Sequence, residues 1–136
     1  MAMPVVRDEL LRVESSQDIV TVRHEVRAWA TALGLNLVDQ TKIVTAASEL
    51  ARNALAYGGG GTACLQALEE GARKGLRLTF DDRGPGIADV ALAMTDGYTT
   101  SGGLGLGLSG AKRLVNDFEI HSIPGEGTRV TITRWK

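Results

Sequence analysis

The sequence has one cysteine, almost no net charge and no long hydrophobic run, and each scarcity excludes a class of protein. Cys64 alone cannot form an internal disulfide, which favours a reducing compartment such as the cytoplasm. Fifteen basic and sixteen acidic residues give a formal net charge of −1, so no basic field indicates a nucleic-acid or membrane partner. No apolar run approaches the roughly 18 residues of a membrane span, and the N-terminal residues lack a signal-peptide pattern.

The motifs of several enzyme classes are also missing. The sequence contains no G-x-x-x-x-G-K-[ST] loop and no H-R-D or D-F-G element, which excludes P-loop enzymes and ordinary protein kinases. Gly105, Gly107 and Gly110 do match G-x-G-x-x-G, but no apolar strand precedes them, as a dinucleotide-binding fold requires. Any nucleotide site must therefore be of another kind.

Glycine, in contrast, is abundant, with 17 of 136 residues. The glycines are clustered: one run covers 58–61, Gly84 and Gly86 flank a proline, and six more lie within 97–110. Clustered glycine indicates a backbone with unusual dihedral angles or one that comes close to a ligand. We therefore expect the function to lie in these clusters.

The remaining sequence predicts one domain over residues 1–136, because it has no internal repeat and no long linker. Hydrophobic periodicity predicts helices over about 16–33, 38–56, 89–94 and 105–117. It predicts strands over about 5–13, 62–70, 75–82, 118–123 and 128–135. Hairpins join most neighbouring strands, which favours a two-layer α/β sandwich with a mixed, mostly antiparallel sheet and helices on one face.

Within the helix predicted over 38–56, Glu49 and Asn53 lie one turn apart at the edge of the apolar stripe. At 100° per residue, Arg52 falls on the far side and faces water. The pair can be read as ordinary polar residues at the boundary of the core. It can also be read as a metal and phosphate site, in which the Asn oxygen binds Mg²⁺ and the Glu accepts a proton.

The strand predicted over 75–82 ends in an inward-facing acid. Its apolar residues occupy even positions, so Asp82 points toward the helices while Asp81 points away. A buried carboxylate is costly unless it accepts hydrogen bonds. It could cap a turn or pair with an arginine. Gly84 and Gly86 also allow a cavity beside it, in which the amine of an adenine would supply the donor.

The glycine-rich segment 100–108 leads into a predicted helix. Free N–H groups at a helix start, with glycines that allow close approach, are suited to phosphate groups. A hinge without a ligand is the alternative. The preceding segment, 95–103, is polar and glycine-rich, and it is a candidate mobile loop.

Together these segments resemble the GHKL superfamily of ATPases, which has the Bergerat ATP-binding fold. The resemblance rests on four motifs in the right order: Glu49-Leu-Ala-Arg-Asn53, Asp82-Arg-Gly84-Pro-Gly86, Gly103-Leu-Gly105-Leu-Gly107-Leu and Gly127-Thr128. The segments 45–53, 97–105 and 125–128 and the chain length further resemble the RsbT family of stressosome switch kinases. The run 58–61 departs from that pattern, which leaves its effect on the nearby phosphates open.

The resemblance implies a cytoplasmic serine/threonine protein kinase that uses Mg-ATP to phosphorylate a STAS-domain partner. It also implies partner switching, in which the released kinase activates a PP2C-type phosphatase or another output, and it allows a weak homodimer. An anti-sigma-factor kinase of the same fold is the nearest alternative. A non-catalytic ATP-gated binding module is another, although Glu49 argues against it, because binding alone needs no base.

The resemblance also implies roles for individual residues. Glu49 would be the general base and Asn53 the Mg²⁺ ligand. Asp82 would accept the adenine amine, with Gly86 beside the base and Thr128 bonded through water. The ATP-binding residues carried over are Asn53, Asp82, Gly84, Gly86, Gly103, Leu104, Gly105, Gly107 and Thr128. The loop 95–103 would be a lid over the nucleotide.

Overall fold

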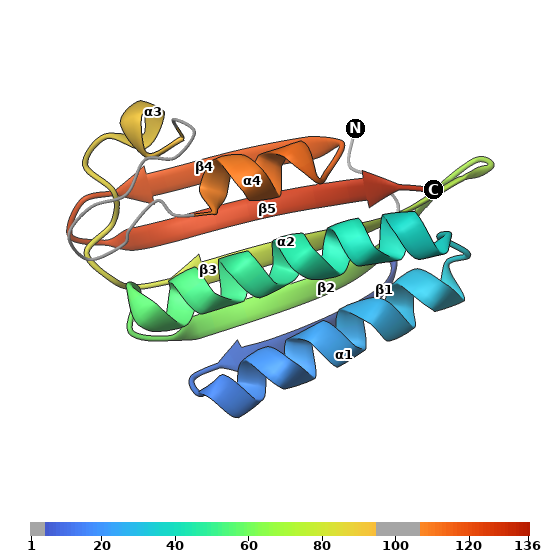
Figure 1. Cartoon of the computed structure of the whole chain (residues 1–136), viewed down its shortest axis with the longest axis horizontal. Coiled ribbons are helices and arrows are strands. Elements are labelled where there is room, and N and C mark those ends of the chain that lie inside the picture. Colours follow the sequence, from blue (N-terminus) through green and yellow to red (C-terminus); the bar gives the residue numbers. More distant parts are fainter. Residues whose placement is uncertain (1–4, 95–106) are drawn as a thin grey trace.

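The computed structural model describes residues 5–94 and 107–136, which form two layers: a five-stranded sheet and helices on one of its faces (Figure 1). The strands are β1 (Val5–Val13), β2 (Gly61–Glu70), β3 (Arg73–Asp82), β4 (Asp117–Ile123) and β5 (Gly127–Trp135). The helices are α1 (Ser16–Ala32), α2 (Leu37–Ala56), α3 (Val90–Ala93) and α4 (Leu108–Arg113). In this part of the chain, no helix is long and apolar enough to cross a membrane.

The strands are ordered β1-β2-β3-β5-β4 in the sheet, and all four pairings are antiparallel. The predicted two-layer sandwich with a mostly antiparallel sheet is confirmed, but the described strands contain no parallel pair, so the sheet is not mixed. The chain leaves β3, passes α3 and α4, enters the sheet at its edge as β4 and returns as β5 beside β3. The ends of β3 and β4 and the start of β5 therefore meet at one end of the sheet.

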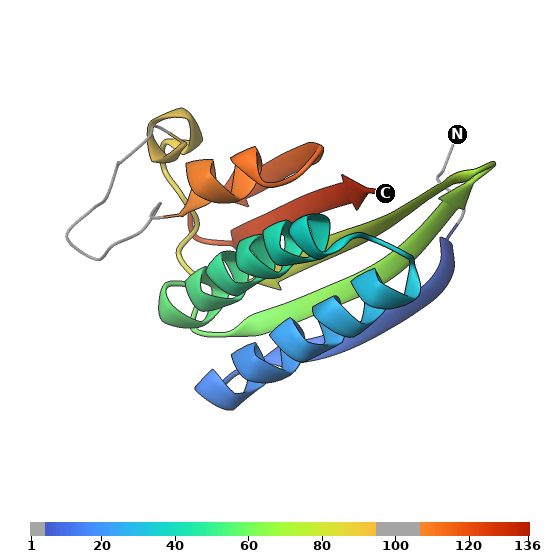
Figure 2. The ribbon, with the colours of Figure 1, turned by 45° about the vertical axis from the view of Figure 1, so that its right-hand side comes forward.

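Both long helices begin at a polar capping residue. The Ser15 hydroxyl accepts a hydrogen bond from the Asp18 N–H at 3.1 Å, and Asn36 Oδ1 accepts from the Asp39 N–H at 2.8 Å. Each cap contributes about 1 kcal/mol. Gly34, with φ +84°, follows α1 and ends it as predicted. Figure 2 shows that α1, α2 and α4 cover the same face of the sheet.

The core lies between this face and the helices. In β3 the even-numbered residues Leu76, Leu78 and Phe80 are buried, as the alternation predicted. On α2 the predicted stripe is buried as well: Ile43, Ala46, Ala47, Leu50 and Ala54. Its alanines let the helix approach the sheet closely. One helix thus carries both part of the core and, along its edge, the candidate functional residues.

An ion pair fixes α2 to the sheet. Arg134 Nη2 of β5 lies 2.5 Å from Asp39 Oδ1, and the two side chains are only 16% and 19% exposed. Arg134 Nη1 also donates to the Leu114 carbonyl at 3.4 Å, just after α4. The first turn of α2 and the end of α4 are therefore bound to the same strand.

The predicted C-terminal boundary of α4 is wrong. The helix stops at Arg113 rather than continuing to Asp117. The reason is a long-range contact, because the Asn116 N–H donates to the Thr133 carbonyl at 2.9 Å and Asn116 Oδ1 accepts from the Trp135 N–H at 2.7 Å. Pairing with β5 takes these residues out of the helix and starts β4.

Candidate functional site

Three polar side chains form a row across the end of the sheet. Asp82 in β3 pairs with Thr128 in β5, which pairs with Ser122 in β4. Two residues further along the same strands, on the same face of the sheet, Phe80 of β3 pairs with Val130 of β5, and both are buried. Polar groups thus stand at the border of an apolar surface, on the face that the helices cover.

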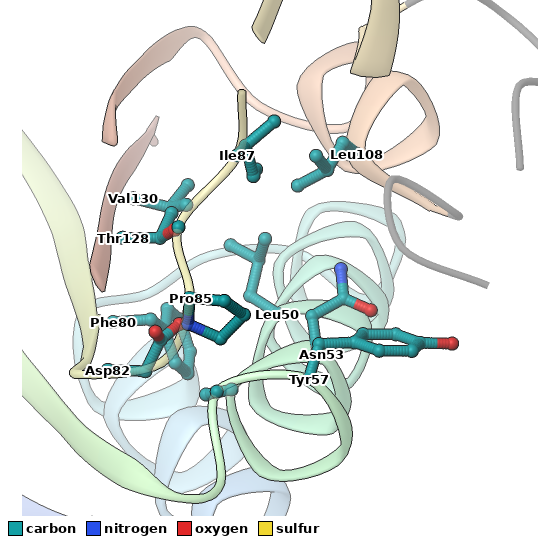
Figure 3. Close-up of a pocket in the computed structure, with 13 residues that line it drawn as sticks. Leu50, Asn53, Tyr57, Phe80, Asp82, Pro85, Ile87, Leu108, Thr128 and Val130 are labelled. Carbon is teal, nitrogen blue, oxygen red and sulfur yellow. The ribbon is translucent and has the colours of Figure 1, made fainter. Parts of the chain in front are cut away.

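A cavity lies between this row, α2 and the start of α4 (Figure 3). Asp82 and Thr128 stand on its strand side, and Asn53 projects from α2 on the other side. Most of the wall is apolar, with Leu50, Phe80, Ile87, Leu108 and Val130 among its residues. A mostly apolar wall with a few polar groups is suited to a flat ring that also forms hydrogen bonds.

The Asp82 carboxylate is held in place by hydrogen bonds from the backbone of Gly84 and Thr128. Its Oδ1 accepts from the Gly84 N–H at 2.9 Å. Burial raises the pKa of Asp82; hydrogen bonds from the backbone of Gly84 and Thr128 lower it, Asp81 raises it, and the net shift is upward. Because burial outweighs these two hydrogen bonds, a ligand N–H that donates to the carboxylate would stabilise its charged form.

The glycines near Asp82 differ in what they do. Gly86, with φ +74°, lines the cavity, and a Cβ there would stand 2.4 Å from the Ile123 carbonyl oxygen. Gly84 does not line the cavity. A Cβ on Gly84 would lie 2.5 Å from Gly58 Cα, so Gly84 lets the two loops pack together. Gly58, which the sequence did not single out as a site residue, itself lines the cavity beside Asp82.

Asn53 and Glu49 lie one turn apart on α2, as predicted, but only Asn53 lines the cavity. Glu49 lies beyond it, where a Cβ on Gly107 would stand 2.4 Å from Glu49 Oε2. Glu49 Oε1 accepts from Arg52 Nη1 at 2.8 Å. Arg52 is exposed as predicted, yet its long side chain reaches back to Glu49, a contact that the helical-wheel position did not indicate.

Of the predicted phosphate-binding residues, Gly107 alone belongs to the described part of the chain. It caps α4 in the left-handed region, with φ +84°. Gly103, Leu104 and Gly105, like the loop 95–103, lie outside the described residues.

Ser122 is a further polar residue that the sequence interpretation missed. Its hydroxyl lies 2.8 Å from Thr128 Oγ1 and accepts from the Ile87 N–H at 2.7 Å. A signal was present, because Ser122 continues the inward set of Phe118 and Ile120 in β4. Asp82 was identified by the same alternation in β3.

Comparison with known proteins shows which family the chain belongs to. Residues 38–136 match the family model "Histidine kinase-, DNA gyrase B-, and HSP90-like ATPase". The chain is 44% identical over 125 residues to Serine/threonine-protein kinase RsbT of Bacillus subtilis (strain 168), covering 92% of this chain and 94% of that protein. It is 29% identical over 133 residues to the anti-sigma F factor of Thermoanaerobacter sp. (strain X514), covering 93% and 92% of the two chains.

A solved structure shares the fold. The RsbU and RsbW domains of Rv1364c from Mycobacterium tuberculosis align with a TM-score of 0.66 at 23% identity, covering 95% of this chain and 32% of that one. The family model covers well over half of the chain, and the 44% identity extends over nearly all of it. The chain belongs to the family of histidine kinase-, DNA gyrase B- and HSP90-like ATPases.

Proposed function

We propose that this protein is a serine/threonine protein kinase that binds Mg-ATP in the cavity beside Asp82. The observation that carries the proposal is this half-buried carboxylate, which lines a mostly apolar cavity beside Thr128. The 44% identity to a serine/threonine-protein kinase supports the reaction type. The predicted ATP-binding role of the glycine-rich segment 100–108 stays part of the proposal.

The adenine ring is proposed to lie between the apolar walls that Leu50 and Ile87 help to form. Its amine would donate to Asp82, and Thr128 would bind it through a water. Gly86 would lie beside the ring, and its lack of a side chain lets it pack against the Ile123 carbonyl. In this orientation the ribose and phosphates leave the cavity past Asn53.

The phosphates would extend toward the start of α4, where Gly107 lies beside Glu49. Gly103, Leu104, Gly105 and Gly107 are the proposed cradle. The donor set fits a magnesium–nucleotide complex rather than a free ion, because Asn53 offers one neutral oxygen and phosphates would supply the charge. In the described residues, no three His, Cys, Asp or Glu side chains gather into a metal site of their own. When bound, Mg²⁺ neutralises phosphate charge.

Glu49 is the proposed general base. As the hydroxyl oxygen of the substrate bonds to the γ-phosphorus, the bond from that phosphorus to the β–γ bridging oxygen breaks and ADP leaves. The hydroxyl proton passes to the Glu49 carboxylate. Arg52 Nη1 donates to Oε1 of that carboxylate, and Oε2 lies beside Gly107.

The proposed substrate is a STAS-domain protein, and the proposed second partner is a PP2C-type phosphatase or another output that the released kinase activates. Identity to RsbT and fold likeness to a chain with RsbU and RsbW domains support partner switching. The proposed location is the cytoplasm. A weak homodimer belongs to the same proposal. The second candidate is an anti-sigma-factor kinase, and the 29% identity to an anti-sigma F factor is the observation that supports it.

The proposal is tested by incubating the purified protein with labelled Mg-ATP and candidate STAS-domain proteins. We expect label on a serine or threonine of one of them, and none with the Glu49→Gln variant. ATP binding by calorimetry without transfer to any candidate would instead support a non-catalytic ATP-gated module. Capture of a sigma factor by the ATP-bound protein would support the anti-sigma alternative.

A further inference from the structure

The Ser122 hydroxyl contacts three groups, one in the segment after β3 and two at the start of β5. It accepts from the Ile87 N–H at 2.7 Å, donates to the Gly127 carbonyl at 3.2 Å and lies 2.8 Å from Thr128 Oγ1. Ile87 and Thr128 line the cavity, whereas Ser122 stands behind them. Ser122 thus connects two walls of the cavity without facing it.

Counting protons gives the direction of the third contact that is compatible with the other two. A hydroxyl has one proton and two lone pairs. The carbonyl of Gly127 can only accept, so it takes the Ser122 proton, and the N–H of Ile87 can only donate, so it takes one lone pair. When Ser122 makes these two bonds together, its remaining lone pair accepts the proton of Thr128. Thr128 therefore turns lone pairs, and no proton, toward the cavity.

We propose that Ser122 is a positioning residue that makes Thr128 a hydrogen-bond acceptor and so selects a 6-aminopurine over a 6-oxopurine. This inference rests on the proposed function, in which the cavity binds a purine nucleotide. Asp82 is the neighbouring acceptor in the strand register. A water held between Asp82 and Thr128 gives one proton to each, so it also shows only lone pairs to the base.

The two kinds of purine meet this polarity differently. The 6-amino group of adenine brings the protons that these acceptors need. The 6-oxo group of hypoxanthine has lone pairs and no proton, so it would face the lone pairs of these acceptors and form no hydrogen bond with them. Without Ser122, the Thr128 hydroxyl is free to turn its proton toward the cavity and to serve an oxo group, directly or through the water. Removal of Ser122 should therefore relax the discrimination.

The experiment measures the affinities of ATP and inosine triphosphate by calorimetry for the wild type and for Ser122→Ala. We expect the ATP preference to fall about fivefold in Ser122→Ala, the factor that corresponds to roughly 1 kcal/mol. The matched control is the same substitution in a Thr128→Val background. That background has no hydroxyl to orient, so there the preference should not change further.

The outcomes separate this inference from the proposed function. If the wild type does not bind ATP, the proposed function fails at once. If it binds ATP but the preference is the same in Ser122→Ala, or changes equally in the Thr128→Val background, the positioning role is wrong. If Ser122→Ala does not fold, Thr128→Ser and Thr128→Val decide the question. Thr128→Ser should keep the preference and Thr128→Val should lower it, and the opposite result overturns the inference.

Discussion

Gly58 lies directly against the side chain of Asp82. A Cβ on Gly58 would stand 2.3 Å from Asp82 Cγ and 2.7 Å from the carbonyl oxygen of Ala54. Gly58 does not have a positive φ, so glycine is required here by space rather than by backbone conformation. The end of α2 and the end of β3 approach more closely than any side chain would allow, and this approach places Asp82 at the cavity.

Gly58→Ala should therefore lower both stability and nucleotide affinity. The added methyl displaces Asp82 or the end of α2, at a cost of about 1–3 kcal/mol in the free energy of unfolding. Gly110→Ala is the matched control, because Gly110 is helical and a Cβ there meets nothing within 4 Å. It should raise stability by about 0.5–1 kcal/mol. Urea denaturation and calorimetry check both; equal behaviour of the two variants would contradict the close packing.

Asp82→Asn should abolish ATP binding, measured by calorimetry. The amide NH₂ would face the adenine amine, so two donors would meet where a donor and an acceptor met before. Asp81→Asn is the control, because Asp81 pairs with Arg129 at 2.7 Å and is partly exposed. It should leave the affinity unchanged. Unchanged affinity in Asp82→Asn would remove the adenine assignment.

The free energy of unfolding of the nucleotide-free protein should depend on pH through the protonation of Asp82. Burial raises the pKa of this carboxyl above its ordinary 3.8. The native state then holds the proton more tightly than the unfolded chain, so the free energy of unfolding decreases as the pH rises from the ordinary pKa through the raised one. Asp82→Asn lacks this component. The stability of the wild type minus that of the variant should fall with rising pH in that window, and a flat or rising difference would contradict the raised pKa.

Glu49→Gln should keep nucleotide affinity but lose phosphoryl transfer. The amide preserves shape and polarity and cannot accept the substrate proton, so we expect a loss on the order of 10²- to 10⁴-fold. Transfer from labelled ATP to a STAS-domain partner measures the rate, and calorimetry measures the affinity. Persistent transfer would mean that Glu49 has only a structural role.

Asn53→Ala should abolish the Mg²⁺-dependent phosphoryl transfer that the wild type shows. Loss of the carboxamide oxygen takes away the ligand that the chain offers to the magnesium–nucleotide complex. Transfer is assayed with Mg²⁺ and with excess EDTA, in the wild type and in the variant. Wild-type activity in EDTA would exclude a role for the metal.

The parts of the site that follow from one element were predictable from the sequence. Helical spacing places Glu49 and Asn53 one turn apart, and strand alternation turns Asp82 inward. The same alternation applies to Ser122, but an inward serine is unremarkable until its partners are known. The bond between Arg52 and Glu49 was missed because a helical wheel gives the direction of a side chain and not its reach.

The parts that depend on two distant segments could not be predicted. The contact of Gly58 with Asp82 needs the ends of α2 and β3 to meet, and the local sequence shows only an excess of glycine. The end of α4 is set by the pairing of Asn116 with β5. The purely antiparallel sheet likewise follows from the insertion of β5 between β3 and β4, which no single hairpin specifies.

Asp82, Thr128 and Ser122 form their row only when β3, β5 and β4 pair in the correct register, so nucleotide binding depends on that register. Side chains alternate along a strand, so a slip of β5 by one residue would put Arg129 or Gly127 in place of Thr128. A chain misaligned in this way would have no adenine site. A bound nucleotide would therefore stabilise the correctly aligned sheet relative to the misaligned one. ATP would in this way favour the correct fold of the protein that binds it.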